Sequence, residues 1–355
     1  MPSTPAQLIE QTTRHAAHVE GLKAGNVKIL QDMLADVQDS LIGKLARQKV
    51  SEWSLKRSVT QLNAFRATAR QYYDSGILPE LDRQTKELAA YEADFEVRSL
   101  RAVVPSYDFT LPTEAQIIAA VMTTPLSVTG PDKGKLLDGF MRDWSEQQIN
   151  RTTNTIRAGY AQGMATPEII RELRDDVGPI NTRGLEGLVR TTLQHAATQA
   201  REQTWNDNSD IVKQVRMVAT LDGKTSPICR AIDGRVFPLD SGPRPPFHPN
   251  CRTTVVGVLD SRYAFLSEGA TRRERDPETG KVGYAPADET YYEWLKRQSP
   301  EFQASVIGPT RAKLLNDGGL SAQRFSELQL GKTFKPLNIE QMRKLEPLAF
   351  ERIGI

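Results

Sequence analysis

Apolar residues recur at every third or fourth position through the first hundred residues of the chain. One run consists of Val27, Leu30, Leu34, Val37, Leu41 and Leu45. This spacing places them on one face of an amphipathic α-helix. A Thr-Pro-Ala-Gln sequence at residues 4–7 fits a helix start, with Thr at the N-cap and Pro at the first helical position. With breaks expected near Gly25, residues 43–51 and residues 76–79, the pattern predicts a long helical N-terminal arm over residues 1–104.

The pattern changes after residue 205, from helical spacing to alternation. A second helical block precedes that point, and Gly178-Pro179 is expected to end one of its helices. Residues 211–220 and 253–259 are rich in β-branched side chains and are predicted to be strands. Between them, residues 221–252 are dense in Pro, Gly, Asp and Ser. The sequence therefore predicts a small antiparallel sheet whose strands bracket a long, ordered loop, and loops of this length are usually functional or held by a cross-link.

The chain after the second strand divides into a charged stretch and a helical end. Residues 260–289 are rich in charged and turn-forming side chains, and we expect a flexible linker there. A weaker hypothesis gives this stretch a contact with DNA through its cations, Arg272, Arg273, Arg275 and Lys281. Residues 290–355 are helical again. The predicted fold class is α+β and predominantly helical, with units at 1–104, 105–259, 260–289 and 290–355.

Charge and hydropathy exclude several classes of protein. There are 46 Lys and Arg against 44 Asp and Glu in 355 residues, a formal net charge of +2. This balance does not indicate a protein that binds nucleic acid by neutralising phosphates. The longest apolar run, Ile117–Met122, is far shorter than the roughly 20 residues of a membrane span. The N-terminus also lacks the basic region and apolar core of a secretory signal. We therefore expect a soluble protein that starts in a cytoplasm and has no membrane partner.

The candidate chemistry lies in the predicted loop, which contains both cysteines of the chain. Cys229, His248 and Cys251 form a Cys-x18-His-x2-Cys pattern. Thiolate and imidazole ligands close to two strand ends suit a tetrahedral zinc ion, for which these three residues are the candidate ligands. The candidates for a fourth ligand are Asp222, Asp233, Asp240, His195 or a water molecule.

Three other interpretations of the same residues stay open. Cys229 could act as a nucleophile activated by His248 and oriented by Asp222. Cys229 and Cys251 could form a disulfide, although a cytoplasm would keep them reduced. Alternatively, the cysteines are small buried apolar groups, and the polar residues satisfy the backbone of the loop. No phosphate-binding glycine loop and no His-Glu-x-x-His motif is present in the sequence.

The loop also carries an ordered set of residues that resembles a known signature. The pattern is Asp, then Thr-Ser-x-x-Cys, an Asp-Gly turn, a proline-rich stretch and His-Pro-x-Cys-Arg. It is matched by Asp222, Thr225, Ser226, Cys229, Asp233, Gly234, Pro246, His248, Pro249, Cys251 and Arg252. The segment resembles the phage Mu protein F family, the minor head or head morphogenesis proteins of tailed phages and prophages. The resemblance extends over residues 144–259, and residues after 290 are similar to the extension that many members carry.

The resemblance implies a virion protein without enzymatic activity, located in the head near the portal after assembly in the host cytoplasm. Its implied role is head assembly or genome delivery, and its implied partners are the portal protein and other head proteins. Structural roles are then expected for Asp222, Thr225, Ser226, Asp233, Gly234, Pro249 and Arg252. A bound zinc would be structural and would close the loop at its two ends. The alternative is a thiol- or zinc-dependent hydrolase that uses Asp222, Cys229 and His248.

Overall fold

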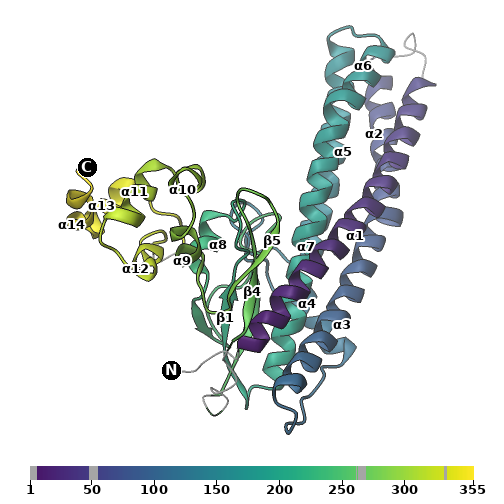
Figure 1. The fold of residues 1–355 in the computed structure, drawn as a ribbon. Coiled ribbons are helices and arrows are strands. Elements are labelled where there is room, and N and C mark those ends of the chain that lie inside the picture. The colour runs from purple at the N-terminus through teal and green to yellow at the C-terminus, as the bar shows by residue number, and fades with distance from the viewer. Residues whose placement is uncertain (1–5, 48–54, 261, 263–268, 332–333) are drawn as a thin grey trace.

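The computed structural model describes residues 6–47, 55–260, 262, 269–331 and 334–355. Its buried side chains form three clusters, which correspond to a long helical bundle, a small sheet at the base of the bundle and a group of short C-terminal helices (Figure 1). The predicted fold class, α+β and predominantly helical, is confirmed. None of the helices in these ranges combines the length and the hydropathy that a membrane span needs.

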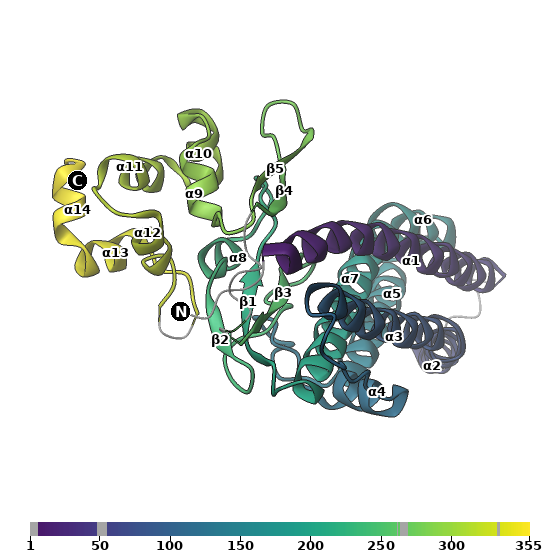
Figure 2. The same cartoon turned by 60° about the horizontal axis from the view of Figure 1, so that its bottom comes forward.

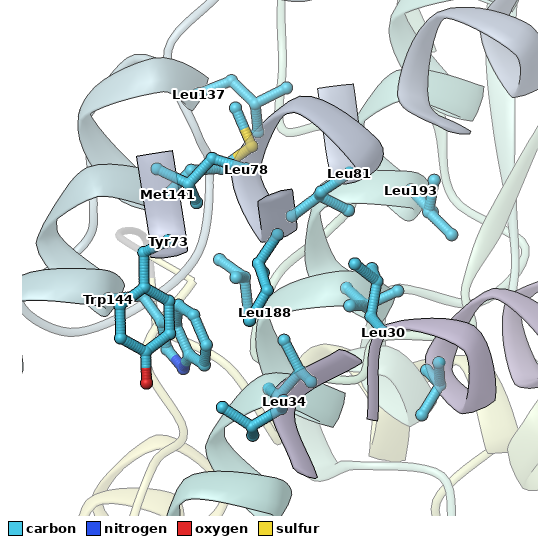
Figure 3. Close-up of a cluster of buried hydrophobic side chains, with 14 of the residues drawn as sticks. Leu30, Leu34, Tyr73, Leu78, Leu81, Leu137, Met141, Trp144, Leu188 and Leu193 are labelled. Carbon is cyan, nitrogen blue, oxygen red and sulfur yellow. The ribbon is translucent and has the colours of Figure 1, made fainter. Parts of the chain in front are cut away.

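The bundle surrounds one central helix, α7 (Gly178–Asp207), in which every residue from Thr191 to Ala200 is buried. The helices around it are α1 (Ala6–Ala46), α2 (Leu55–Tyr72), α3 (Leu78–Val103), α4 (Glu114–Thr123), α5 (Leu137–Ala161) and α6 (Thr166–Glu172). Leu30 and Leu34 from the predicted stripe of α1 pack with Leu188 of α7 (Figure 3). Burial of these leucines holds the bundle together, because each contributes roughly 1.5–3 kcal/mol when fully buried.

Two predicted helix breaks are not breaks in the structure. Short π-helical segments, Tyr73–Ile77 and Leu173–Val177, join α2 to α3 and α6 to α7. In each case a proline, Pro79 or Pro179, follows two residues later. Proline cannot donate the helical hydrogen bond and its ring clashes with the preceding turn, and the wider π turn accommodates both effects without ending the helix. The break expected near Gly25 is also absent, since α1 runs without interruption.

The sheet has the order β2-β1-β3, and both pairings are antiparallel. Its strands are β1 (Val212–Val218), β2 (Val236–Pro238) and β3 (Thr254–Leu259). The central residue Val215 faces Phe237 on one side and Gly257 on the other. The expected long loop therefore joins the two neighbouring strands β1 and β3. Within it lie the short helix α8 (Pro227–Ile232) and the edge strand β2.

The C-terminal helices have their own buried cluster, which includes Tyr292, Trp294, Phe325 and Phe350. These helices are α9 (Tyr291–Lys296), α10 (Pro300–Ile307), α11 (Pro309–Asp317), α12 (Ala322–Glu327), α13 (Ile339–Leu345) and α14 (Pro347–Arg352). Helix α9 packs on α8 and so connects this unit to the loop. The helical character expected for residues 290–355 is present in the described residues.

The structure differs from the expected organisation in two places. The range expected as a flexible linker contains a hairpin, β4 (Thr271–Arg275) paired with β5 (Val282–Pro286). Residues 261 and 263–268 of that range lie outside the described residues. The expected boundary at residues 104 and 105 also crosses a continuous core, because α1 and α3 pack directly on α7. The N-terminal helices are thus part of the bundle, and their apolar stripe is covered by later helices.

A buried carboxylate connects the bundle to the sheet. Glu96 of α3 accepts hydrogen bonds from Arg201 Nε at 2.8 Å and from Trp205 Nε1 at 2.7 Å, both from α7. Arg201 also donates to the hydroxyl oxygen of Thr254 in β3 and to that of Thr12 in α1. Because Glu96 and Arg201 are both almost fully buried, the loss of either partner leaves an unpaired charge in the interior.

We expect Glu96→Ala to lower the free energy of unfolding by about 3–5 kcal/mol, because Arg201 would remain buried without its carboxylate. Equilibrium unfolding in urea measures this change. The matched control is Glu87→Ala on the same helix, where an exposed carboxylate pairs with Arg83, and a change of no more than about 0.5 kcal/mol is expected there. Equal effects of the two substitutions would contradict the role given to Glu96.

Candidate functional site

Helix α8 positions Cys229 at the start of the loop. The Ser226 side chain accepts a hydrogen bond from the Cys229 backbone N–H at 3.3 Å and caps the helix, and Pro227 occupies the first turn. Both residue types are favoured at these positions. The cap places Cys229 in the first turn with its side chain in the core of the sheet, where only 2% of the residue is exposed.

His248 and Cys251 reach the same place from the far end of the loop. Cys229 Sγ lies 3.7 Å from Cys251 Sγ and 3.2 Å from His248 Nε2, and the three ligand atoms lie within 4.8 Å of one another. The sulfur atoms belong to free cysteines. Two sulfurs bound at ~2.3 Å to one tetrahedral zinc ion would lie about 3.8 Å apart. The spacing in the structure therefore fits a shared metal and not a disulfide, whose sulfurs are ~2.05 Å apart.

The orientation of the His248 ring also fits a metal ligand. Its Nδ1 lies 2.8 Å from the carbonyl oxygen of Pro249 and donates to it. In a neutral imidazole, this contact leaves Nε2, the atom that faces the sulfurs, without a proton and able to bind a metal. Donation of the other ring N–H to a carbonyl is the usual arrangement around metal-bound histidine. The contact also gives Pro249 a role in the cluster.

The cluster is electrostatically asymmetric. The hydrogen bond to Cys251 and burial raise the pKa of the Cys229 thiol well above its ordinary value. Burial opposes ionisation of Cys251 too, but hydrogen bonds with Cys229 and His248 outweigh it and hold the pKa of the Cys251 thiol below its ordinary value. Burial likewise disfavours the charged form of His248, yet its hydrogen bond to Cys251 raises the pKa of the imidazole. Negative charge is thus favoured on Cys251, beside its two neighbours.

None of the protein side chains considered as a fourth ligand faces this cluster. Asp222 and Asp233 are each bound by an arginine, and Asp240 is exposed. His195 lies in the bundle, where its Nε2 contacts the carbonyl oxygen of Val121 at 3.0 Å and burial lowers its pKa to about 4. Among the described residues, the group of side chains that could hold a metal ion consists of Cys229, His248 and Cys251.

A small cavity adjoins the cluster. Its volume is about 30 Å³, and Thr225, Ser226 and Asn250 line it together with Cys229 and His248. This space is sufficient for a water molecule. Of the five candidates for the fourth ligand, water is therefore the one that the geometry accommodates.

In addition to the Cys229–His248–Cys251 cluster, an ion pair joins the two ends of the loop. Arg252, at the end of the loop, donates to both carboxylate oxygens of Asp222, at its beginning, at 2.6 and 2.9 Å. Asp222 also accepts hydrogen bonds from the Thr225 hydroxyl and the Lys224 backbone N–H. Burial alone would raise the pKa of the Asp222 carboxyl, but Arg252 and these hydrogen bonds hold it below its ordinary value. The carboxylate therefore stays charged and paired.

A second aspartate of the signature anchors the neighbouring elements. Asp233 accepts hydrogen bonds from the backbone N–H groups of Ala219 and Tyr291, and its side chain forms a buried ion pair with Arg272 of β4. Gly234 follows with a φ of 77°, and a Cβ at this position would lie 2.8 Å from Thr290 Cγ2. A glycine is therefore required here by the backbone conformation and by the close approach of α9.

Arg244 is a structural residue of the loop that the sequence did not reveal. Its guanidinium donates to the carbonyl oxygens of Pro238, Leu239, Ser241 and Pro243. It also donates to Glu202 of α7 at 2.8 Å. These bonds satisfy the backbone of the proline-rich stretch, which has few N–H groups of its own. No local pattern marks Arg244, because its acceptors become neighbours only when the loop has folded around it.

The arrangement does not assemble the catalytic trio considered for a hydrolase. His248 Nδ1 donates to Pro249 and not to Asp222, whose oxygens bind Arg252, Thr225 and Lys224. The Cys229 thiol is buried, and its pKa is raised, whereas an activated nucleophile needs a lowered pKa and access to substrate.

The same stretch of chain matches a known protein family. Residues 150–256, from the middle of α5 to the middle of β3, match the family model described as Phage Mu protein F like protein. Over this segment the chain is similar to the phage Mu protein F-like family. The matched segment contains the whole of the closed loop, including Asp222, Arg252 and the Cys229–His248–Cys251 cluster. The match suggests a phage head morphogenesis protein. No curated protein and no solved structure matched the chain.

Proposed function

We propose that the protein is a minor head protein of a tailed phage or prophage, which docks at the portal and supports head assembly or genome delivery. The observation that carries this proposal is the family match over residues 150–256. The contacts of the signature residues in the structure support it. The signature residues pair with one another and with neighbouring elements, and they build a rigid loop. A scaffold of this kind suits a protein that functions by docking to other proteins.

The rest of the architecture is compatible with that role. The net charge of +2 provides no general attraction to DNA, whereas the long bundle offers extended helical faces for protein contacts. We place the protein in the virion head near the portal, with assembly in the host cytoplasm. Its proposed partners are the portal protein and other head proteins.

We further propose that Cys229, His248 and Cys251 hold a structural zinc ion, with a water molecule as the fourth ligand. The support comes from the 3.7 Å separation of the two sulfur atoms, the His248 Nε2 that faces them and the adjoining water-sized cavity. When bound, zinc would link α8 to the segment before β3. Binding to the folded loop would add directly to its stability.

We expect about one zinc per chain in protein purified without chelators, measured by elemental mass spectrometry. Cys229→Ser should lose the metal and lower the melting temperature by roughly 4–8 °C, the shift that corresponds to about 2 kcal/mol in a domain of this size. Asp240→Ala, in the same loop but exposed, is the control, and it should keep the zinc content and the melting temperature of the wild-type protein. Metal-free wild-type protein, or Cys229→Ser with full zinc content, would refute the zinc site.

The docking proposal is tested by co-expression with the portal protein of the same phage, followed by size-exclusion chromatography. We expect the two proteins to migrate together, whereas the portal protein of an unrelated phage, used as the control, should migrate alone. Clean separation of two well-folded cognate proteins would contradict portal docking. The zinc measurement is independent of this result, because it concerns the isolated chain.

A further inference from the structure

A groove separates the N-terminal half of α1 from the β4–β5 hairpin. Figure 2 shows this end of α1 beside the hairpin and β3. The groove has a volume of about 380 Å³, within the range of clefts that bind small ligands. Its α1 wall is formed by Thr13, Ala16, Ala17 and Glu20, which lie on one helical face. Because three of these side chains are small, the wall leaves room for an occupant.

The acidic residues that line the groove are already neutralised. Glu20 pairs with Lys23 at 2.8 Å and with Arg190 at 3.0 Å. Asp222 pairs with Arg252, as described above, and Glu274 pairs with Arg297, the residue that caps the C-terminus of α9. Each carboxylate therefore pairs with a cation other than Arg273 and Arg275, the two arginines of β4 that line the groove.

Those two arginines, Arg273 and Arg275, have no carboxylate partner among the described residues. Arg273 and Arg275 alternate with Arg272 and Glu274 along β4. Arg273 and Arg275 are the two exposed residues of this strand. The Arg275 guanidinium donates to the carbonyl oxygen of Gly280, at 3.1 Å. Two guanidinium groups, two positions apart on one strand, thus border the groove without pairing with any carboxylate of the described residues. Guanidinium groups bind carboxylate and phosphate oxygens through paired hydrogen bonds.

The surroundings favour a protein ligand over DNA. The lining of the groove also includes apolar side chains, Val218 and Val282, in addition to Ala16 and Ala17. The hairpin turn next to the two arginines carries Asp276 and Glu278, both exposed, so the free positive charge here is confined to Arg273 and Arg275, whereas a duplex is bound through a longer row of cations. Arg272, one of the cations considered for DNA contact, is buried against Asp233. An extended peptide can place carboxylates on the arginines and apolar side chains against the apolar lining, because successive residues point to opposite sides.

We propose that this groove binds an acidic, extended segment of a partner protein, with Arg273 and Arg275 as the residues that recognise its carboxylates. The proposal goes beyond portal docking and does not require the partner to be the portal protein. It assigns a ligand class to a surface outside the closed loop, and it predicts which substitutions weaken binding without affecting the fold.

The test measures fluorescence anisotropy of a labelled peptide of alternating Glu and Val, added to the full-length protein at low salt. We expect binding that Arg273→Ala/Arg275→Ala weakens about tenfold or more. Ala17→Leu, which fills the groove without a change in charge, should also weaken it. The matched control is Arg157→Ala/Arg174→Ala, which removes two exposed arginines of the bundle and should bind like wild type.

Three results would overturn the proposal. The first is failure of the wild-type protein to bind the Glu-Val peptide, and the second is equal binding by the Arg273/Arg275 and Arg157/Arg174 variants. The third is tighter binding of a labelled DNA duplex, lost in the Arg273/Arg275 variant, which would make the groove a nucleic-acid site. A peptide of alternating Lys and Val should not bind in any variant. Circular dichroism spectra of all variants confirm that loss of binding is not loss of fold.

Discussion

The closure of the connection between β1 and β3 is the constraint on which the rest of the structure depends. Asp222 and Arg252 are 30 residues apart in sequence, and their bidentate ion pair fixes orientation as well as distance. The Cys229–His248–Cys251 cluster joins the same two ends inside the core. Because α8 and Asp233 are held within this loop, and Asp233 in turn holds β4 and α9, the position of the C-terminal helices also follows from the closure.

Much of this architecture could be predicted from local patterns. The three- and four-residue spacing identified the buried stripe of α1, and the β-branched runs at residues 211–220 and 253–259 coincide with β1 and β3. Cys229, His248 and Cys251 were candidate ligands of one zinc ion, and in the structure their ligand atoms lie together. These features depend on residues that are close in sequence, or on side chains whose chemistry has few alternatives in a core.

The remaining features depend on contacts between distant segments. Pro79 and Pro179 look like helix ends in sequence, but neighbouring helices keep the chain helical through a π turn. The hairpin at residues 271–286 looks like a charged linker because its inward arginine, Arg272, finds an acid only in the folded protein. Arg244 has the same property, since its acid, Glu202, lies 42 residues away in sequence. In each case a charged residue or proline has a role that only tertiary structure supplies.

The central claim is that the signature residues function by holding the loop together. Amide hydrogen exchange followed by mass spectrometry tests it most directly, with Asp222→Asn compared with wild type and with Asp240→Asn as the exposed control. The account predicts exchange about tenfold faster or more for residues 221–253 in Asp222→Asn, because Arg252 loses its charged partner, and unchanged protection in α7. Unchanged protection of residues 221–253 would contradict the account.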